Sequence, residues 1–122
     1  MNQSDYVFTS VEDQLELARL QAIEREVDPA SRRRLYATGL TTGWRCLEVG
    51  PGAGSLMQWI GERVGPTGRI VALDLSPKFL TAHHPAHVEI QQGDIRTAAL
   101  LPGSFDLVHA RYVLIHLPDY EI

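Results

Sequence analysis

Apolar residues near the N-terminus recur at the three-and-four spacing of an amphipathic helix. Residues 10–27, SVEDQLELARLQAIEREV, interleave these positions with charged ones. One stripe holds Val11, Leu15, Ala18 and Ala22, and beside it lie Leu20, Ile23 and Val27. Ser10 with Asp13 resembles a capping box at the start of the segment. We therefore expect an amphipathic helix over residues 10–27 with this apolar stripe.

A second helix is predicted directly after the first, in the sequence DPASRRRLYATG. Asp28 can cap its N-terminus, Pro29 suits the first helical position, and Gly39 suits the stop. The N-terminal part of the chain, residues 1–40, is thus expected to be a segment of two helices.

From Arg45 onward the pattern changes to short apolar runs that alternate with helical segments. The runs RCLEV, RIVALD, HVEIQ and FDLVHA are typical of strands, at residues 45–49, 69–74, 87–91 and 105–110. Helices are expected from about Ser55 to Val64 and, more briefly, over residues 76–82. Strands that alternate with helices pair in parallel through right-handed crossovers. Residues 41–122 are therefore expected to form a doubly wound α/β domain.

Composition narrows the class of protein. The 122 residues suit one domain, and 44% hydrophobic with 21% charged residues is ordinary globular composition. The net charge is −4 and the basic residues are scattered, apart from a triplet at residues 32–34 that suits a solvated face, so we expect no nucleic acid partner. No apolar run approaches the length of a membrane-spanning helix, and the first residues lack the pattern of a signal peptide. Cys46 is the single cysteine, which fits a reducing compartment. We expect a cytoplasmic protein.

The stretch CLEVGPGAGS places three glycines at alternate positions behind the first predicted strand. A turn needs one or two glycines, so a third suggests that a ligand approaches the backbone closely. The dinucleotide fingerprint requires glycine or alanine at its sixth position, which is Ser55 counted from Gly50 and Met57 counted from Gly52. The P-loop requires a Gly-Lys-Ser/Thr sequence, which is absent from this stretch. Neither phosphate-binding motif fits.

The remaining pattern, Glu-x-Gly-x-Gly-x-Gly from Glu48 to Gly54, resembles the class I S-adenosylmethionine-dependent methyltransferases. Three further stretches match the family in its order: VALDLS, which contains Asp74, QGDI, which contains Asp94, and FDLVHARYVLIHLPD. The resemblance runs from about Trp44 to Asp119. It implies a mostly parallel, Rossmann-like sheet with strand order 3-2-1-4 and S-adenosylmethionine as cofactor.

The resemblance also implies roles for individual residues. Glu48 would lie near the amino group of the methionine moiety, and Asp74 would accept hydrogen bonds from the ribose hydroxyls. Asp94 would bind the adenine amino group. The full set of expected cofactor-binding residues is Glu48, Gly50, Gly52, Gly54, Asp74, Leu75, Asp94, Ile95 and His109. The residues also allow other roles than cofactor binding. Glu48 would then be a polar residue at the end of a strand, and Asp74 and Asp94 would cap the turns that follow them.

Several other residues invite a chemical reading. His109 and Arg111 lie at the carboxyl end of the fourth predicted strand, and His109 is the candidate for a catalytic base, with cofactor contact or packing as its alternative. The stretch HHPAH, with His83, His84 and His87, has only Glu89 as a nearby partner, so we expect no metal site. His116 is expected to be structural, and Cys46 a small buried hydrophobe.

Relatives of this kind continue with a helix, a fifth strand and an antiparallel pair of strands, whereas this sequence stops at Ile122. We therefore expect a truncated form, incomplete at its C-terminus, that catalyses poorly and self-associates through the open edge of its fourth strand. The predicted function is methyl transfer to a small-molecule acceptor. One alternative is a non-catalytic module that binds S-adenosylmethionine. A weaker alternative is a nicotinamide-dependent oxidoreductase, against which the failed sixth position counts.

Overall fold

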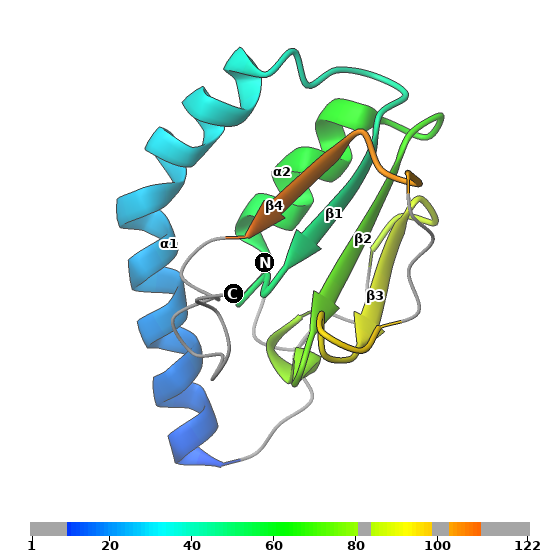
Figure 1. The fold of residues 1–122 in the computed structure, drawn as a ribbon. Coiled ribbons are helices and arrows are strands. Elements are labelled where there is room, and N and C mark those ends of the chain that lie inside the picture. The colour runs from blue at the N-terminus through cyan, green and yellow to red at the C-terminus, as the bar shows by residue number, and fades with distance from the viewer. Residues whose placement is uncertain (1–9, 81–83, 99–102, 111–122) are drawn as a thin grey trace.

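The computed structural model describes residues 10–80, 84–98 and 103–110, which form helices on one side of a parallel sheet (Figure 1). The elements follow the alternation expected from the apolar runs. In chain order they are α1 (Val11–Ala37), β1 (Arg45–Val49), α2 (Ser55–Val64), β2 (Arg69–Asp74), the 3-10 turn η2 (Pro77–Phe79), β3 (Val88–Gln92) and β4 (Leu107–Ala110).

The four strands pair in parallel in the order β3-β2-β1-β4, which confirms the predicted topology. In the register, Cys46 of β1 faces Ile70 of β2 on one side and Leu107 of β4 on the other. Because the chain returns past β1 to place β4, the strand order reverses at β1. In such sheets ligands bind beyond the carboxyl ends of the strands at the reversal.

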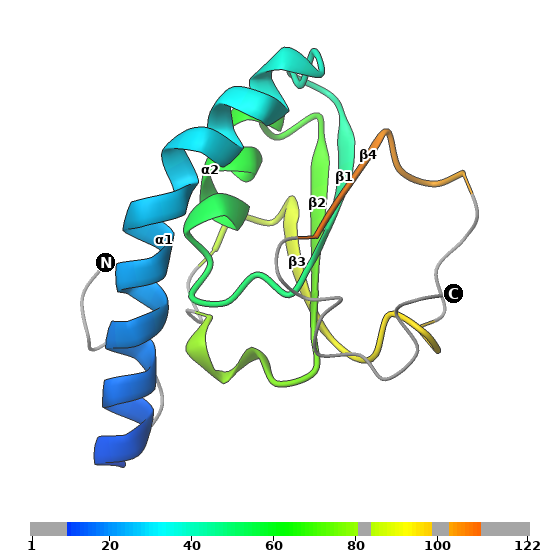
Figure 2. The same ribbon diagram turned by 60° about the vertical axis from the view of Figure 1, so that its left-hand side comes forward.

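Both faces of the sheet are covered, as its apolar strands require. On one face, α2 packs Leu56, Ile60 and Val64 against Ile70 and neighbouring strand residues. On the other face, a smaller cluster groups Leu47, Val49, Val71 and Leu73 with Ile95, Ala98 and Phe105. Seen along the edge of the sheet, α1 and α2 lie on the same side (Figure 2). The carboxyl ends of the strands and the side of the sheet that carries α1 are therefore where a site is expected.

The two predicted N-terminal helices are in fact one, because α1 continues through Pro29. Proline in a helix interior removes one backbone hydrogen bond and costs about 3 kcal/mol. Asp28 does not cap a second helix; its carboxylate is buried and accepts a 2.5 Å hydrogen bond from the Ser55 hydroxyl. This tertiary contact holds the segment against α2, and the helix bends along its length (Figure 2).

The predicted apolar stripe of α1 is not its buried face. Val11 and Leu15 are 67% and 65% exposed. The buried residues of α1 are Leu17, Glu24, Asp28, Ser31 and Leu35, so the inward face is largely polar. The partner surface explains this, because α1 packs against backbone and hydroxyl donors of the α2 N-terminus as well as against apolar side chains.

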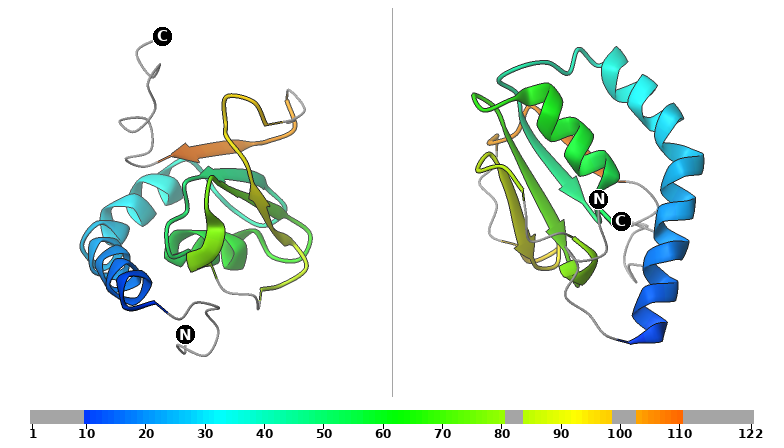
Figure 3. Two further views of the ribbon diagram at one scale, coloured as in Figure 1. Left: turned by 90° about the horizontal axis from the view of Figure 1, so that it is seen from below. Right: turned by 180° about the vertical axis from the view of Figure 1, so that it is seen from behind.

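Three contacts fix the ends of α1. At its start, the Ser10 hydroxyl accepts a hydrogen bond from the backbone N–H of Asp13, at 3.0 Å, as a capping residue does. The Asp13 carboxylate forms an ion pair with Lys78 at 2.6 Å instead of closing the capping box. At the other end, the Arg63 guanidinium of α2 lies 4.7 Å from the ring centre of Tyr36. Views from below and from behind show how α1 runs alongside α2 (Figure 3).

The strand predictions were accurate for β1 and β2, while β3 is displaced by one residue and β4 begins two residues later. The short helix predicted over residues 76–82 is a single 3-10 turn within the described part of the chain. No helix in residues 10–80, 84–98 and 103–110 is both long and apolar enough to span a membrane.

Candidate functional site

A cavity of about 490 Å³ opens at the carboxyl ends of the strands. Four segments line it: α1, the loop after β1, the end of β2 with the residues that follow, and the end of β3. The lining residues are Arg19, Leu20, Ile23, Glu24, Val49, Gly50, Pro51, Gly52, Leu73, Asp74, Leu75, Ser76, Phe79, Gly93, Asp94 and Ile95. Six predicted site residues are among them: Gly50, Gly52, Asp74, Leu75, Asp94 and Ile95.

The glycines of the loop after β1 serve two purposes. Gly52 has a φ of 64°, and a Cβ there would lie 3.3 Å from Oε1 of Glu24. Gly54 has a φ of 91°, and its Cβ would lie 2.9 Å from a methyl of Leu80. Gly52 therefore keeps space free beside the cavity. Gly54, which does not line the cavity, is required by backbone conformation and by packing beneath the loop.

Glu24 of α1, which the sequence analysis did not single out, holds the loop after β1 in place. Oε1 of Glu24 accepts a hydrogen bond of 2.8 Å from the backbone N–H of Ala53. Glu24 is 8% exposed and lines the cavity. Ala53, with Leu17 and Phe79, also forms a small apolar cluster against which Leu20 packs. Helix α1 thus closes one side of the cavity.

Asp74 ends β2 and turns its carboxylate toward the loop. Its Oδ1 accepts a 2.9 Å hydrogen bond from the backbone N–H of Ser76. Burial raises the pKa of the Asp74 carboxyl above its ordinary value. Hydrogen bonds from the backbone N–H groups of Ser76, Gly52 and Leu75 oppose this rise. Asp74 therefore supports the turn after β2 and also presents an acceptor to the cavity.

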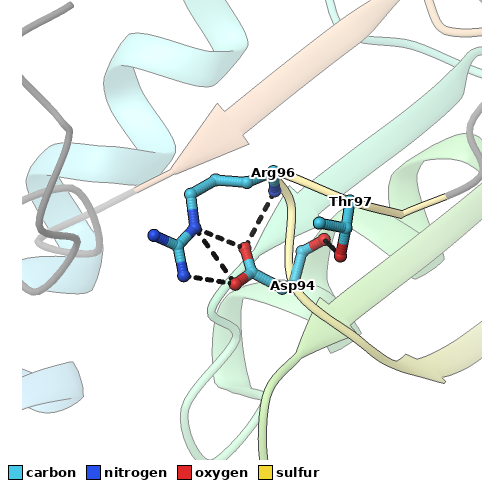
Figure 4. Close-up of polar contacts among 3 residues, drawn as sticks. All are labelled: Asp94, Arg96 and Thr97. Carbon is cyan, nitrogen blue, oxygen red and sulfur yellow. Dashed lines mark hydrogen bonds and ion pairs between the residues drawn. The ribbon is translucent and has the colours of Figure 1, made fainter.

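Asp94 follows β3 and is engaged by a neighbour. Figure 4 shows the Arg96 guanidinium folded back onto the Asp94 carboxylate, with Nη2 2.6 Å from Oδ2 and Nε 3.0 Å from each oxygen. The backbone N–H of Arg96 donates a further bond of 2.9 Å to Oδ1. Hydrogen bonding to Arg96 lowers the pKa of Asp94 to about 2. The carboxylate is thus fixed in its ionised form at the cavity.

Glu48 and His109 lie behind the loop and do not line the cavity. They face each other across the β1 and β4 pair, and Nδ1 of His109 lies 3.6 Å from Oε2 of Glu48. Glu48 is 3% exposed. The structure therefore brings these two predicted site residues together, but apart from the six that line the cavity. Arg111 and His116 lie outside the described residues.

Of the described histidines between η2 and β3, only His87 has a packing role. Nε2 of His87 lies 2.8 Å from the carbonyl oxygen of Gly61 in α2, while His84 is exposed. His83 lies outside the described residues. Within residues 10–80, 84–98 and 103–110, no group of three histidine, cysteine, aspartate or glutamate residues is arranged to hold a metal ion.

Cys46 is a packing residue of β1. Its side chain is 1% exposed, and burial raises the pKa of its thiol to about 11. A thiol that stays protonated is a poor nucleophile. Its placement confirms the expectation of a small buried hydrophobe.

Comparison with known proteins identifies the family of this chain. Residues 47–122, which include the loop after β1 and the ends of β2 and β3, match the family model described as a methyltransferase domain. The chain belongs to this family. The methyltransferase resemblance of the sequence motifs is thereby confirmed.

Relatives of the methyltransferase domain include enzymes named for small molecules. Aklanonic acid methyltransferase DauC from Streptomyces sp. (strain C5) is 31% identical over 98 residues, or 75% of this chain and 44% of the relative. Nocamycin O-methyltransferase from Saccharothrix syringae is 34% identical over 98 residues, or 75% of this chain and 35% of the relative. The chain thus spans less than half the length of these relatives.

A solved structure supports the fold of the methyltransferase domain. The crystal structure of a SAM-dependent methyltransferase from Aquifex aeolicus matches 77% of this chain and 55% of its own, with a TM-score of 0.59. Because the sequence identity is only 20%, this match shows that the two proteins share a fold and nothing more. The shared fold agrees with the parallel sheet of this chain, whose strand order is β3-β2-β1-β4.

Proposed function

We propose that this chain is the cofactor-binding part of an S-adenosylmethionine-dependent methyltransferase that acts on a small molecule. The observation that carries the proposal is one cavity into which the loop after β1, Asp74 and Asp94 converge. Its volume of about 490 Å³ falls within the usual range for small-ligand sites. The mixture of apolar walls with a few acceptors suits a nucleoside that carries hydroxyl and amino groups.

The strand order suggests how the cofactor lies. Because β3, β2 and β1 are neighbours in that order, a ligand along their carboxyl ends would meet Asp94 first, then Asp74, and then the loop. We assign the adenine to Asp94 and Ile95, and the ribose hydroxyls to Asp74 with Leu75 beside it. The methionyl part would lie over Gly50 and Gly52. Gly54, Glu48 and His109 would support this loop from behind.

The bound cofactor would supply an electrophilic methyl group on a sulfonium. The residues of this chain would contribute binding and orientation, which supply much of the rate in such an in-line displacement. A proton must be removed only where the acceptor carries one, and His109, the candidate base from the sequence, does not line this cavity. The contact between His109 and Glu48 would orient the imidazole ring.

A small-molecule acceptor is supported by the relatives named for aklanonic acid and nocamycin. The net charge of −4, with basic residues scattered apart from the triplet at residues 32–34, also disfavours a nucleic acid substrate. We further propose that the protein self-associates through β4, which lies at the edge of the sheet in the described part of the chain. Sedimentation velocity over a concentration series tests this, and a monomer at every concentration would contradict it.

Calorimetric titration with S-adenosylhomocysteine and, separately, with NAD tests the proposed cofactor. We expect binding of S-adenosylhomocysteine and none of NAD. Tighter binding of NAD would favour the oxidoreductase alternative. A methyl-transfer assay with candidate acceptors then separates an enzyme from a module that only binds the cofactor.

A further inference from the structure

Glu24 presents a buried negative charge to the cavity. The exposed fraction of Glu24 is only 8%, and the residue lines the cavity from α1. Its single hydrogen bond among the described residues comes from the backbone N–H of Ala53. This N–H lies just before α2, where the positive end of the helix dipole favours an anion.

Two positively charged side chains near the cavity are engaged elsewhere. Arg19, which also lines the cavity, is paired with Glu16, and Arg96 is paired with Asp94. None of the ion pairs between described residues includes Glu24. A buried carboxylate without a counter-charge is costly, so a cationic group of a ligand would be bound strongly beside it.

The position of Glu24 indicates which part of a ligand it would meet. It touches the loop after β1, and its Oε1 lies 3.3 Å from the point where a Cβ of Gly52 would be. Asp94 follows β3, two strands away from the loop after β1, whereas Asp74 ends the neighbouring strand β2 and accepts from the Gly52 N–H. Glu48, the acid that family resemblance assigns to the methionine amino group, lies outside the cavity lining.

We infer that Glu24 of α1 is the residue that pairs with the α-ammonium group of the cofactor. This inference rests on the proposed function and adds a residue from outside the sequence motifs. In binding the ammonium group, Glu24 would also tie α1 to the loop, so that the helix closes over the aminoacyl end of the ligand.

The test is a cycle of two proteins and two ligands, measured by calorimetry. The protein variant is Glu24→Gln, which keeps the size of the side chain and an oxygen acceptor for the Ala53 N–H but removes the charge. The ligands are S-adenosylhomocysteine and its analogue with hydrogen in place of the α-amino group. We expect Glu24→Gln to weaken S-adenosylhomocysteine about tenfold or more and to leave the analogue unchanged.

Two controls keep the outcomes distinct. Glu26→Gln makes the same chemical change on an exposed position of α1 and should leave both affinities unchanged. Glu48→Gln should retain the preference of the wild type for S-adenosylhomocysteine over the analogue, and this measurement does not depend on the folding of the Glu24 variant.

Three results would overturn the inference. Equal losses for both ligands in Glu24→Gln would mean that Glu24 only shapes the loop. Unchanged affinities in that variant, or loss of the preference in Glu48→Gln, would assign the ammonium group elsewhere. If the wild type bound neither ligand, the proposed function itself would fail, and this pattern differs from the other three.

Discussion

The cavity has two walls that arise in different ways along the chain. The sheet wall consists of Gly50, Gly52, Asp74 and Asp94, which lie at the end of β1, β2 or β3 or within three residues after it. The helix wall consists of Arg19, Leu20, Ile23 and Glu24 of α1. Each residue of the sheet wall occupies a position that a strand end dictates. The helix wall exists only because α1 turns one particular face toward the loop.

This difference shows which kind of site can be located from a sequence motif. Parallel strands bring their carboxyl ends to one edge, so motifs at strand ends converge whatever the side chains between them. A helix can present any of its faces, and the choice depends on the surface it packs against. The predictions that follow test the two walls in turn, beginning with the largest expected effect.

Replacing Gly52 with valine should abolish binding of S-adenosylhomocysteine. A β-branched side chain at a φ of 64° is strained, and its Cβ would lie 3.3 Å from Oε1 of Glu24, in space shared by both walls. Gly65→Val is the matched control, because Gly65 has a φ of 65° and nothing within 4 Å of its Cβ position. Calorimetry should show normal affinity in the control. Equal loss in both variants would assign the effect to backbone strain alone.

Replacing Asp74 with alanine should weaken binding of S-adenosylhomocysteine by about 1–3 kcal/mol, because the ribose hydroxyls lose their acceptor in the sheet wall. Asp74→Asn, which keeps one oxygen acceptor and can still accept from the Ser76 N–H, should lose less. Calorimetric titration of both variants measures the difference. Wild-type affinity in Asp74→Ala would leave Asp74 only its role in the turn after β2.

Replacing Ser55 with alanine tests how α1 is fixed in place. The hydroxyl of Ser55 donates to the buried Asp28 carboxylate, so its loss should lower the free energy of unfolding by about 1–2 kcal/mol. Ser55→Thr, which retains the hydroxyl, serves as the control. Urea denaturation gives both values, and an unchanged midpoint in Ser55→Ala would show that this contact does not stabilise the packing of α1.

The smallest effect concerns the protonation of Asp94. Arg96 holds the pKa of this carboxyl at about 2, below the value of 3.8 that it has without partners. Because the folded value is the lower one, the resulting stabilisation is complete above pH 3.8 and is lost as the pH falls toward 2. In Arg96→Ala the titration should move up toward 3.8. Carboxyl NMR measures it, and an unchanged pKa would contradict the assigned cause.

The motif-bearing half of the chain was predictable because local patterns agree with the tertiary structure. Continuous apolar runs marked β1 and β2 to the residue, since strands buried on both faces carry few polar positions. Gly65 marked the end of α2. The family resemblance assigned Asp74 and Asp94 to the cofactor, and both line the cavity.

The N-terminal helix α1 was predicted wrongly because its local signals conflict with the surface it packs against. The apolar positions Val11 and Leu15 suggested the wrong inward face, and Asp28-Pro29 suggested a helix boundary. The available sign of the buried face was a set of polar residues spaced four and three apart, namely Glu24, Asp28 and Ser31. Polar residues at that spacing usually indicate the solvent-exposed face of a helix.

The strand order was implied by the resemblance to a known family. The sequence by itself determined the positions of the strands, the glycine loop after β1 and the carboxylates at or just after the ends of β2 and β3. Periodicity and chain connectivity suffice for these features, because a parallel sheet places successive strand ends at one edge. Only the tertiary structure decided that α1 is continuous, that Glu24 reaches the Ala53 N–H, and that Glu48 lies behind the loop. The physical reason is that a buried polar side chain is stabilised by the donor it meets, and that donor lies 29 residues away from Glu24 along the chain.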